Sequence, residues 1–140
     1  MKLISQYRYE LAAFFSGAAT LVLEMLGLNI IAPYFGTALI VQSNLLGIVL
    51  LALAVGYWRG GRLADRETSE VNIGRVLFRI GVLITIFFSF REVLGGVFRA
   101  ILVVPSYGSF LLVVTLFFWP CYEIGKLLPL IVRASVVSVS

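Results

Sequence analysis

The sequence predicts an all-α, polytopic membrane protein: a bundle of four transmembrane helices with one short interfacial or re-entrant helix. Of the 140 residues, 61% are hydrophobic and 13% are charged, whereas a soluble domain is about half apolar and a quarter charged. Apolar runs of about 20 residues, long enough to cross a bilayer, alternate with short polar stretches. We therefore expect one membrane domain over residues 1–140, with the lipid bilayer as the partner of most of its surface.

The first helix is predicted over residues 11–31. This 21-residue apolar run is longer than the core of a secretory signal peptide and continues without a small-residue cleavage site, so we expect it to be retained. One face carries small and polar residues at intervals of three and four, which would let another helix approach closely. That stripe consists of Ala13, Gly17, Thr20, Glu24 and Gly27.

Glu24 is the most informative residue of this stripe, and Thr20 lies one turn before it. The carboxyl group lies about 4.5 Å beyond the midpoint of the run. An ionised group at the centre of a membrane costs roughly 3 kcal/mol, so Glu24 should face protein or a watery cavity. Two interpretations stay open: a site for a cation or proton, and a carboxyl group hydrogen-bonded to a neighbouring helix.

The second helix is predicted over residues 39–58. Pro33 should end the first helix and Gly36 should form the turn between them. Ala52, Gly56 and Gly60 recur every four residues along the second helix, which predicts a face that packs closely on another helix.

A charged segment, GYWRGGRLADR, follows this apolar run. The glycine pair is expected to break the helix, and Arg62 and Asp65 to form a local ion pair. The positive-inside rule places this segment in the cytoplasm, so a multi-pass protein of the cell membrane with cytoplasmic N- and C-termini is predicted. We expect its loop residues to serve packing and orientation, namely Gly60, Gly61, Arg62, Asp65 and Arg66.

The third helix is predicted over residues 72–90, followed by the short interfacial or re-entrant helix over residues 93–104. Only 11 residues lie between Arg79 and Arg91, which is too few for a span, so Arg75 and Arg79 should extend toward the cytoplasmic headgroups. The run from Val93 to Val104 has 12 residues and contains Arg99, which is too short and too charged for a span.

The fourth helix is predicted over residues 109–133, with a kink at Pro120. Glu123 and Lys126 are three residues apart on one face. An ion pair within the helix, which lowers the cost of insertion, is favoured over a substrate site. Glu24 and Glu123 are expected about 9 Å apart in depth, so one compact site with both carboxyl groups would require a helix displacement.

Several functional classes are not expected. The 11 Lys and Arg residues flank apolar runs instead of forming a patch, which argues against nucleic acid as a partner. One cysteine and no histidine leave no basis for a Cys/His metal site or a triad of the Ser-His type. No phosphate-binding strand–loop–helix motif is present, and we expect neither a cofactor nor an enzyme activity.

Two stretches carry a family resemblance: LVLEMLGLNIIAPYFG at Leu21–Gly36 and LLGIVLLALAVGYWRGGRLADR at Leu45–Arg66. Together they resemble the N-terminal membrane region of the integral-membrane spermidine synthase-like proteins, in which a helical bundle precedes an aminopropyltransferase domain. The resemblance covers about the first half of the chain. Asn29, Gln42 and Arg59 depart from the family pattern, where a basic, an aromatic and an apolar residue are expected.

The resemblance implies a membrane portion without the aminopropyltransferase domain. Such a chain would handle a cationic polyamine, with Glu24 and Glu123 as attracting acids, or would anchor a separate membrane or soluble partner. A structural or truncated membrane subunit, which packs on a partner or forms a homo-oligomer, is the alternative from another functional class. The segment GGRLADR also resembles the loop between helices two and three of major facilitator transporters, so a fragment of such a transporter is a third reading.

Overall fold

The computed structural model describes residues 2–66, 70–101 and 104–139, and all but a few of these residues are helical. The elements follow in the order α1 (Lys2–Phe35), α2 (Leu39–Arg66), α3 (Glu70–Ile101), α4 (Pro105–Val113), η1 (Val114–Phe118) and α5 (Trp119–Val139). Four stretches are long and apolar enough to cross a membrane: Glu10–Phe35, Leu39–Asp65, Ile73–Ile101 and Pro105–Ser135. The predicted all-α bundle of four spans is confirmed, with longer helices than expected.

Helix α1 runs to Phe35 and therefore passes Pro33, which was expected to end it. A proline in the last turn of a helix removes only one backbone hydrogen bond, so the helix can include Pro33 and end two residues after it. The chain then turns at Gly36, whose φ of 75° lies in the region that glycine adopts without steric cost. The predicted turn is confirmed, and the helix boundary at residue 31 was wrong.

Helix α2 continues through Gly60 and Gly61 to Arg66, so the predicted break at the glycine pair was wrong. In a helix the backbone N–H and C=O groups bond to one another, and this is favoured in a membrane because no water is present to bond them. Gly60 is buried against α5, so close packing offsets its low helix propensity.

Helix α3 is one continuous helix of 32 residues. The separate helix predicted over residues 93–104 was wrong: residues 93–101 are the last turns of α3, and residues 102–103 lie outside the described part of the chain. Arg91 and Arg99 do not interrupt the helix because both side chains are exposed on its surface and a long basic side chain can reach toward the headgroups.

The last span contains α4, the π-helical segment η1 and α5 in direct succession. Pro120 is buried at the start of α5, immediately after η1. A proline inside an α-helix loses its bond to the preceding turn and its ring clashes with a carbonyl group there. The wider π turn just before Pro120 accommodates both effects, so the predicted irregularity at this proline takes the form of a π segment.

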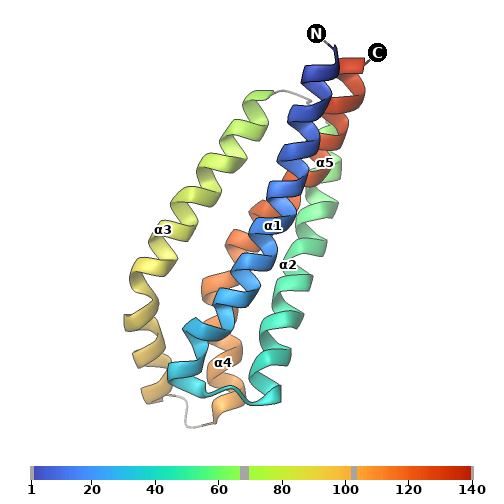
Figure 1. Ribbon diagram of the computed structural model, residues 1–140. Coiled ribbons are helices and arrows are strands. Elements are labelled where there is room, and N and C mark those ends of the chain that lie inside the picture. The colour runs from blue at the N-terminus through green and yellow to red at the C-terminus, as the bar shows by residue number, and fades with distance from the viewer. Residues whose placement is uncertain (1, 67–69, 102–103, 140) are drawn as a thin grey trace.

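Figure 1 shows both chain ends at the end of the bundle where α2 finishes and α3 begins, as an even number of spans requires. Basic residues are concentrated toward the same end. Arg91 and Arg99 belong to the second half of α3, which leads away from the chain ends. The other described basic side chains belong to the last turns of α2, to the first turns of α3 and to α5: Arg59, Arg62, Arg75, Arg79, Lys126 and Arg133. This asymmetry agrees with the positive-inside rule, and a cytoplasmic location of the termini stays a prediction.

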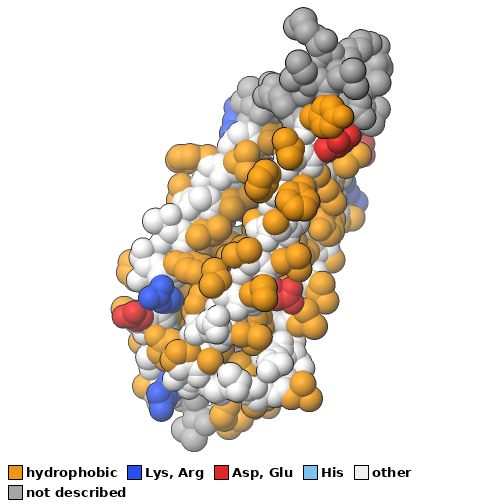
Figure 2. Space-filling view, in the orientation of Figure 1, with side chains coloured by type: hydrophobic (Ala, Val, Ile, Leu, Met, Phe, Trp, Pro, Cys, Tyr) orange, Lys and Arg blue, Asp and Glu red, His pale blue; other side chains and the backbone are white. Residues whose placement is uncertain are grey.

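The last span forms the centre of the bundle. In its most apolar stretch 61% of the residues are buried, against 39% for α2, 11% for α1 and 6% for α3. Hydrophobic side chains are spread along the whole described length of the face shown in Figure 2. Many large hydrophobic residues of the chain are exposed, for example Phe14, Met25 and Phe78. A surface of this kind is stable in lipid and not in water, so the chain is a multi-pass membrane protein.

Candidate functional site

Helices α2 and α5 cross in backbone contact at three glycines. A Cβ atom placed on Gly56 would lie 2.5 Å from the carbonyl oxygen of Tyr122, and one on Gly60 would lie 2.8 Å from the Cα atom of Lys126. From the other side, a Cβ atom on Gly125 would lie 2.8 Å from the carbonyl oxygen of Leu53. Small residues permit such an approach, and the close-packing face predicted from the four-residue repeat in α2 is confirmed.

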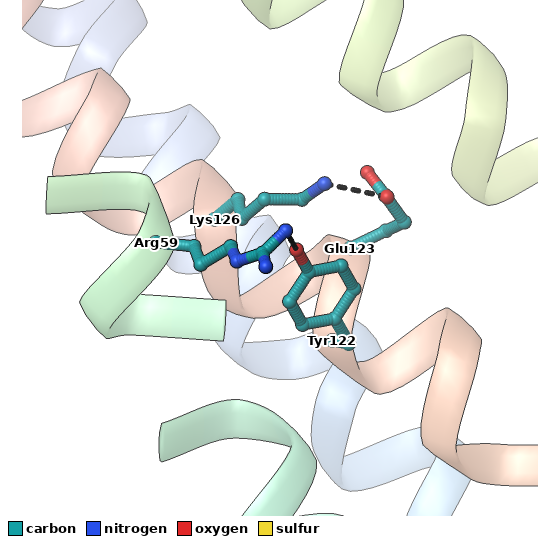
Figure 3. Close-up of polar contacts among 4 residues, drawn as sticks. All are labelled: Arg59, Tyr122, Glu123 and Lys126. Carbon is teal, nitrogen blue, oxygen red and sulfur yellow. Dashed lines mark hydrogen bonds and ion pairs between the residues drawn. The ribbon is translucent and has the colours of Figure 1, made fainter. Parts of the chain in front are cut away.

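This crossing positions a buried ion pair in the first two turns of α5. The Lys126 ammonium group donates a hydrogen bond to Glu123 Oε1, and both side chains are about nine-tenths buried (Figure 3). Glu123 Oε2 is buried and has no hydrogen-bond partner among the described residues. Lys126 also lies 4.4 Å from the centre of the Tyr122 ring. The pairing expected from the spacing of the two residues is therefore present.

On the outer side of Lys126, α2 and α5 form an open groove of about 440 Å³. We call it the cationic groove, and its lining residues are Trp58, Arg59, Arg62, Leu63, Tyr122 and Lys126. Figure 3 shows Arg59 on α2 reaching the hydroxyl group of Tyr122 on α5, with Lys126 alongside; the Nη1–Oη distance is 3.5 Å. No carboxyl group is among these lining residues, so the groove presents positive charge and aromatic surface.

The Arg62 guanidinium group lies 4.0 Å from the centre of the Trp58 ring. The predicted ion pair with Asp65 was wrong: neither residue takes part in a salt bridge between described side chains. Stacking on an aromatic ring one turn away keeps the guanidinium group in place without a carboxylate. Sequence reasoning could have found this contact, since Trp58 and Arg62 are four residues apart on one helix.

The other loop residues lie on a different side of α2. Gly61 and Asp65 line a shallow depression with Arg133 of α5. A Cβ atom on Gly61 would meet no atom within 4 Å, so this glycine, unlike Gly60, is not required by packing. Arg66 is the last residue of α2, and its side chain lies outside the described part of the structure.

No hydrogen bond or ion pair between described residues joins Glu24 to Glu123. The Thr20 hydroxyl group donates a hydrogen bond to the carbonyl oxygen of Ser16 one turn earlier, at 3.1 Å, and so is satisfied within α1. Glu24 is half-buried and has no hydrogen bond or ion pair with any described residue.

A polar contact at the opposite end of the bundle was missed by sequence reasoning. The Asn44 side-chain amide on α2 donates hydrogen bonds to the carbonyl oxygen of Ser106 and to the hydroxyl oxygen of Ser109 on α4, both at 3.0 Å. Ser109 is fully buried. Because bonds of this kind hold helices together in lipid, Asn44 fixes α2 to the start of the last span.

Helix α3 carries an outward-facing stripe of small and polar residues. Some of its bulky apolar residues, such as Val76, Ile80 and Phe87, pack against the rest of the bundle, whereas others, such as Ile86 and Phe90, are exposed. The opposite side of the helix is exposed, and a Cβ atom on any of the glycines there would meet no atom within 4 Å. We call this stripe the outward face of α3. Its residues are spaced at intervals of three and four, and all except Phe78 are small or polar: Gly74, Phe78, Gly81, Thr85, Ser89, Glu92, Gly96 and Arg99.

Comparisons with family models, with curated proteins and with solved structures give no match for this chain. The main structural features available for a functional conclusion are therefore the glycine crossing with its buried ion pair, the cationic groove and the outward face of α3.

Proposed function

We propose that this chain is an assembly subunit of the membrane, which anchors a partner chain by packing the outward face of α3 against a transmembrane helix of that chain. The observation that carries this proposal is the row of small and polar residues that α3 exposes, among them Gly81, Thr85 and Ser89. Bulky exposed residues such as Ile86 and Phe90 flank this row. Helix pairs in membranes meet at small residues, because these allow the backbones to approach.

The polar residues of the outward face support the same conclusion. The hydroxyl groups of Thr85 and Ser89 donate hydrogen bonds within α3, at 2.8 and 2.7 Å, but their oxygens can still accept a bond from a neighbouring helix.

The depth of Glu92 in the membrane follows from the arginines of α3. Glu92 is about 10 Å from Arg99 along the helix axis. Arg79 and Arg99 are about 30 Å apart along the axis, which is the thickness of the hydrocarbon core.

Glu92 thus faces outward within the apolar layer. Its one described partner is the neighbouring Arg91, at 3.4 Å, and its side chain is 76% exposed. A charged group at such a depth is costly in contact with lipid tails. Contact with polar groups of a second protein would lower that cost.

The family resemblance supports an anchoring role. In the spermidine synthase-like proteins a helical bundle of this kind stands beside an aminopropyltransferase domain, and here the chain would serve a separately encoded protein. In this proposal the contribution of the chain is assembly and not catalysis. A fragment of a major facilitator transporter would also require its missing helices on a neighbouring chain, and the sequence of the captured partner distinguishes the two origins.

A bulky substitution on the outward face should prevent assembly. We expect Gly81→Leu to shift the complex extracted from native membranes in mild detergent to the mass of the isolated chain, because the leucine separates the two helix backbones. Gly47→Leu on α2 is the matched control, since Gly47 is also exposed and a Cβ atom there would meet no atom within 4 Å. The measurement is the protein mass by light scattering, with the detergent contribution subtracted.

The purified chain on its own separates two kinds of partner. A dimer that Gly81→Leu dissociates identifies the partner as a second copy, and a monomer that forms a larger complex only in native membranes identifies a different chain. A monomer under both conditions would contradict the proposal, and so would an equal effect of the two leucine substitutions.

Polyamine handling is a second candidate, favoured by one observation. Glu24 has no described partner within its span, and Glu123 Oε2 is also free of hydrogen bonds to described residues. Two acidic groups in a membrane could attract a cationic amine. The cationic groove and the neutralisation of Glu123 by Lys126 weigh against it, because both reduce the attraction for a polycation.

Uptake of labelled spermidine by liposomes that contain the chain tests this candidate. If a polyamine passes Glu24, the Glu24→Gln variant should take up spermidine at least about tenfold more slowly, since one charge-assisted hydrogen bond in a dry site contributes at least about 1.5 kcal/mol. Glu92→Gln is the control for loss of an acid elsewhere. Uptake equal to that of empty liposomes, or unchanged in Glu24→Gln, would remove the transport function.

A further inference from the structure

We propose that the cationic groove binds a phosphate group, and that the ligand is the headgroup of an anionic phospholipid in the leaflet next to the chain ends. This inference is independent of the partner proposed for α3, because the groove lies between α2 and α5 and contains no described residue of α3. It assigns a ligand to residues that the glycine crossing brings together.

The groove lies at the depth of the lipid phosphates. Arg59 lies 20 positions after Leu39, where α2 begins, which corresponds to about 30 Å of helix, the thickness of the hydrocarbon core. Trp58 and Tyr57 precede Arg59 and occupy the position at which aromatic side chains collect in membrane proteins. The guanidinium groups of Arg59 and Arg62 are therefore level with the headgroup layer.

Two of the three cations of the groove, Arg59 and Arg62, are not paired with any described carboxylate. Among the described side chains the ion pairs are those of Arg91 with Glu92 and of Lys126 with Glu123, so Arg59 and Arg62 have no carboxylate partner. Glu123 approaches Lys126 from the side away from Arg59 (Figure 3). Basic pockets between transmembrane helices commonly hold acidic lipid headgroups.

The cations are held in place before a ligand arrives. Arg62 lies over Trp58, Arg59 reaches Tyr122, and Lys126 is fixed between Glu123 and the Tyr122 ring. Stacking uses the face of a guanidinium group and leaves its N–H edge available, and that edge matches two oxygens of a phosphate. Side chains ordered in advance lose less entropy on binding.

The surface next to the groove favours a lipid over a soluble phosphate. Phe118 and Trp119 pack on Tyr122 with ring centres 6.5 and 6.2 Å away, and Trp119 is 53% exposed. Both residues precede Tyr122 on the last span and so lie deeper in the membrane. They extend the groove into an apolar surface on which acyl chains can lie.

Tryptophan fluorescence reports the occupant of the groove, because Trp58 lines it and Trp119, the other tryptophan of the chain, borders it. The test uses the whole chain in phosphatidylcholine nanodiscs that contain a small fraction of brominated phosphatidylglycerol, whose bromines quench tryptophan on contact. We expect quenching to saturate at a phosphatidylglycerol fraction well below that at which brominated phosphatidylcholine has the same effect.

The double variant Arg59→Gln/Arg62→Gln should weaken the preference for phosphatidylglycerol roughly 25-fold, or about fivefold for each arginine. Arg75→Gln/Arg79→Gln removes the same charge at the same end of the bundle and should leave the preference unchanged. Equal loss in the two double variants would overturn the proposal, since it would indicate attraction to net charge and not to the groove. Circular dichroism of each variant confirms that it is folded.

Inorganic phosphate and glycerol phosphate, added at millimolar concentration, distinguish the sources of the phosphate. Failure of both to relieve the quenching supports the lipid. If they bind with the same dependence on the two arginines while brominated phosphatidylglycerol shows no preference, the groove takes a soluble phosphate and the lipid assignment is wrong.

Discussion

Valine in place of Gly60 should lower the free energy of unfolding by about 3 kcal/mol, at the upper end of the usual cost of overpacking. A Cβ atom at this position would lie 2.8 Å from both the Cα atom and the carbonyl oxygen of Lys126. Both are backbone atoms that cannot rotate away, so α2 and α5 must separate. The measurement is unfolding of the detergent-solubilised chain, followed by circular dichroism.

Gly61→Val provides the control from the adjacent position on the same helix. A Cβ atom there meets nothing within 4 Å, so the change should alter the unfolding free energy by about 0.5 kcal/mol or less. Equal destabilisation by the two valines would show that loss of glycine itself matters and that the close crossing of α2 and α5 does not.

The second large effect is expected from Lys126→Met. Removal of the ammonium group leaves the Glu123 carboxyl group buried without its partner, and breaking a buried pair in this way costs about 3–5 kcal/mol. One Glu123 oxygen already lacks a hydrogen-bond partner among the described residues, so the carboxyl group has little other support. Unfolding in detergent by the same optical measurement gives the loss of stability.

Replacement of both partners should restore most of that stability. In Glu123→Leu/Lys126→Met no charge stays buried at this site, and apolar side chains of similar size often match or exceed the stability of a buried ion pair. A double variant that is as unstable as the sum of the two single variants would mean that the two side chains do not interact, contrary to the structure.

Hydropathy and the spacing of small residues predicted the larger features of the fold. Four apolar runs gave four spans, because each must satisfy its backbone hydrogen bonds internally. The repeat of Ala52, Gly56 and Gly60 correctly indicated a close contact. It could not identify α5 as the helix in contact, since Gly125 is a single glycine without a repeat of its own.

Helix ends and side-chain partners were predicted less well, and Gly60 and Gly61 show why. Both are helical, although a glycine pair breaks helices in soluble proteins, because the packing of α5 on Gly60 outweighs its propensity. Arg62 stacks on Trp58 and does not pair with Asp65, and Arg59 comes together with Tyr122 and Lys126 only through the tertiary fold. The cationic groove therefore could not be predicted from the sequence alone.

The π segment η1 has a consequence for the face of the last span that enters the core. Ser109, Val113, Phe117 and Cys121 recur every four residues, and all are at most 1% exposed. In a straight α-helix such positions drift by about 40° with each step, or about 120° from the first to the last. The wider π turn has more residues per turn and so offsets much of this rotation around the helix axis. As a result, one side of the last span stays buried from the Asn44 contact to the ion pair of Glu123 and Lys126.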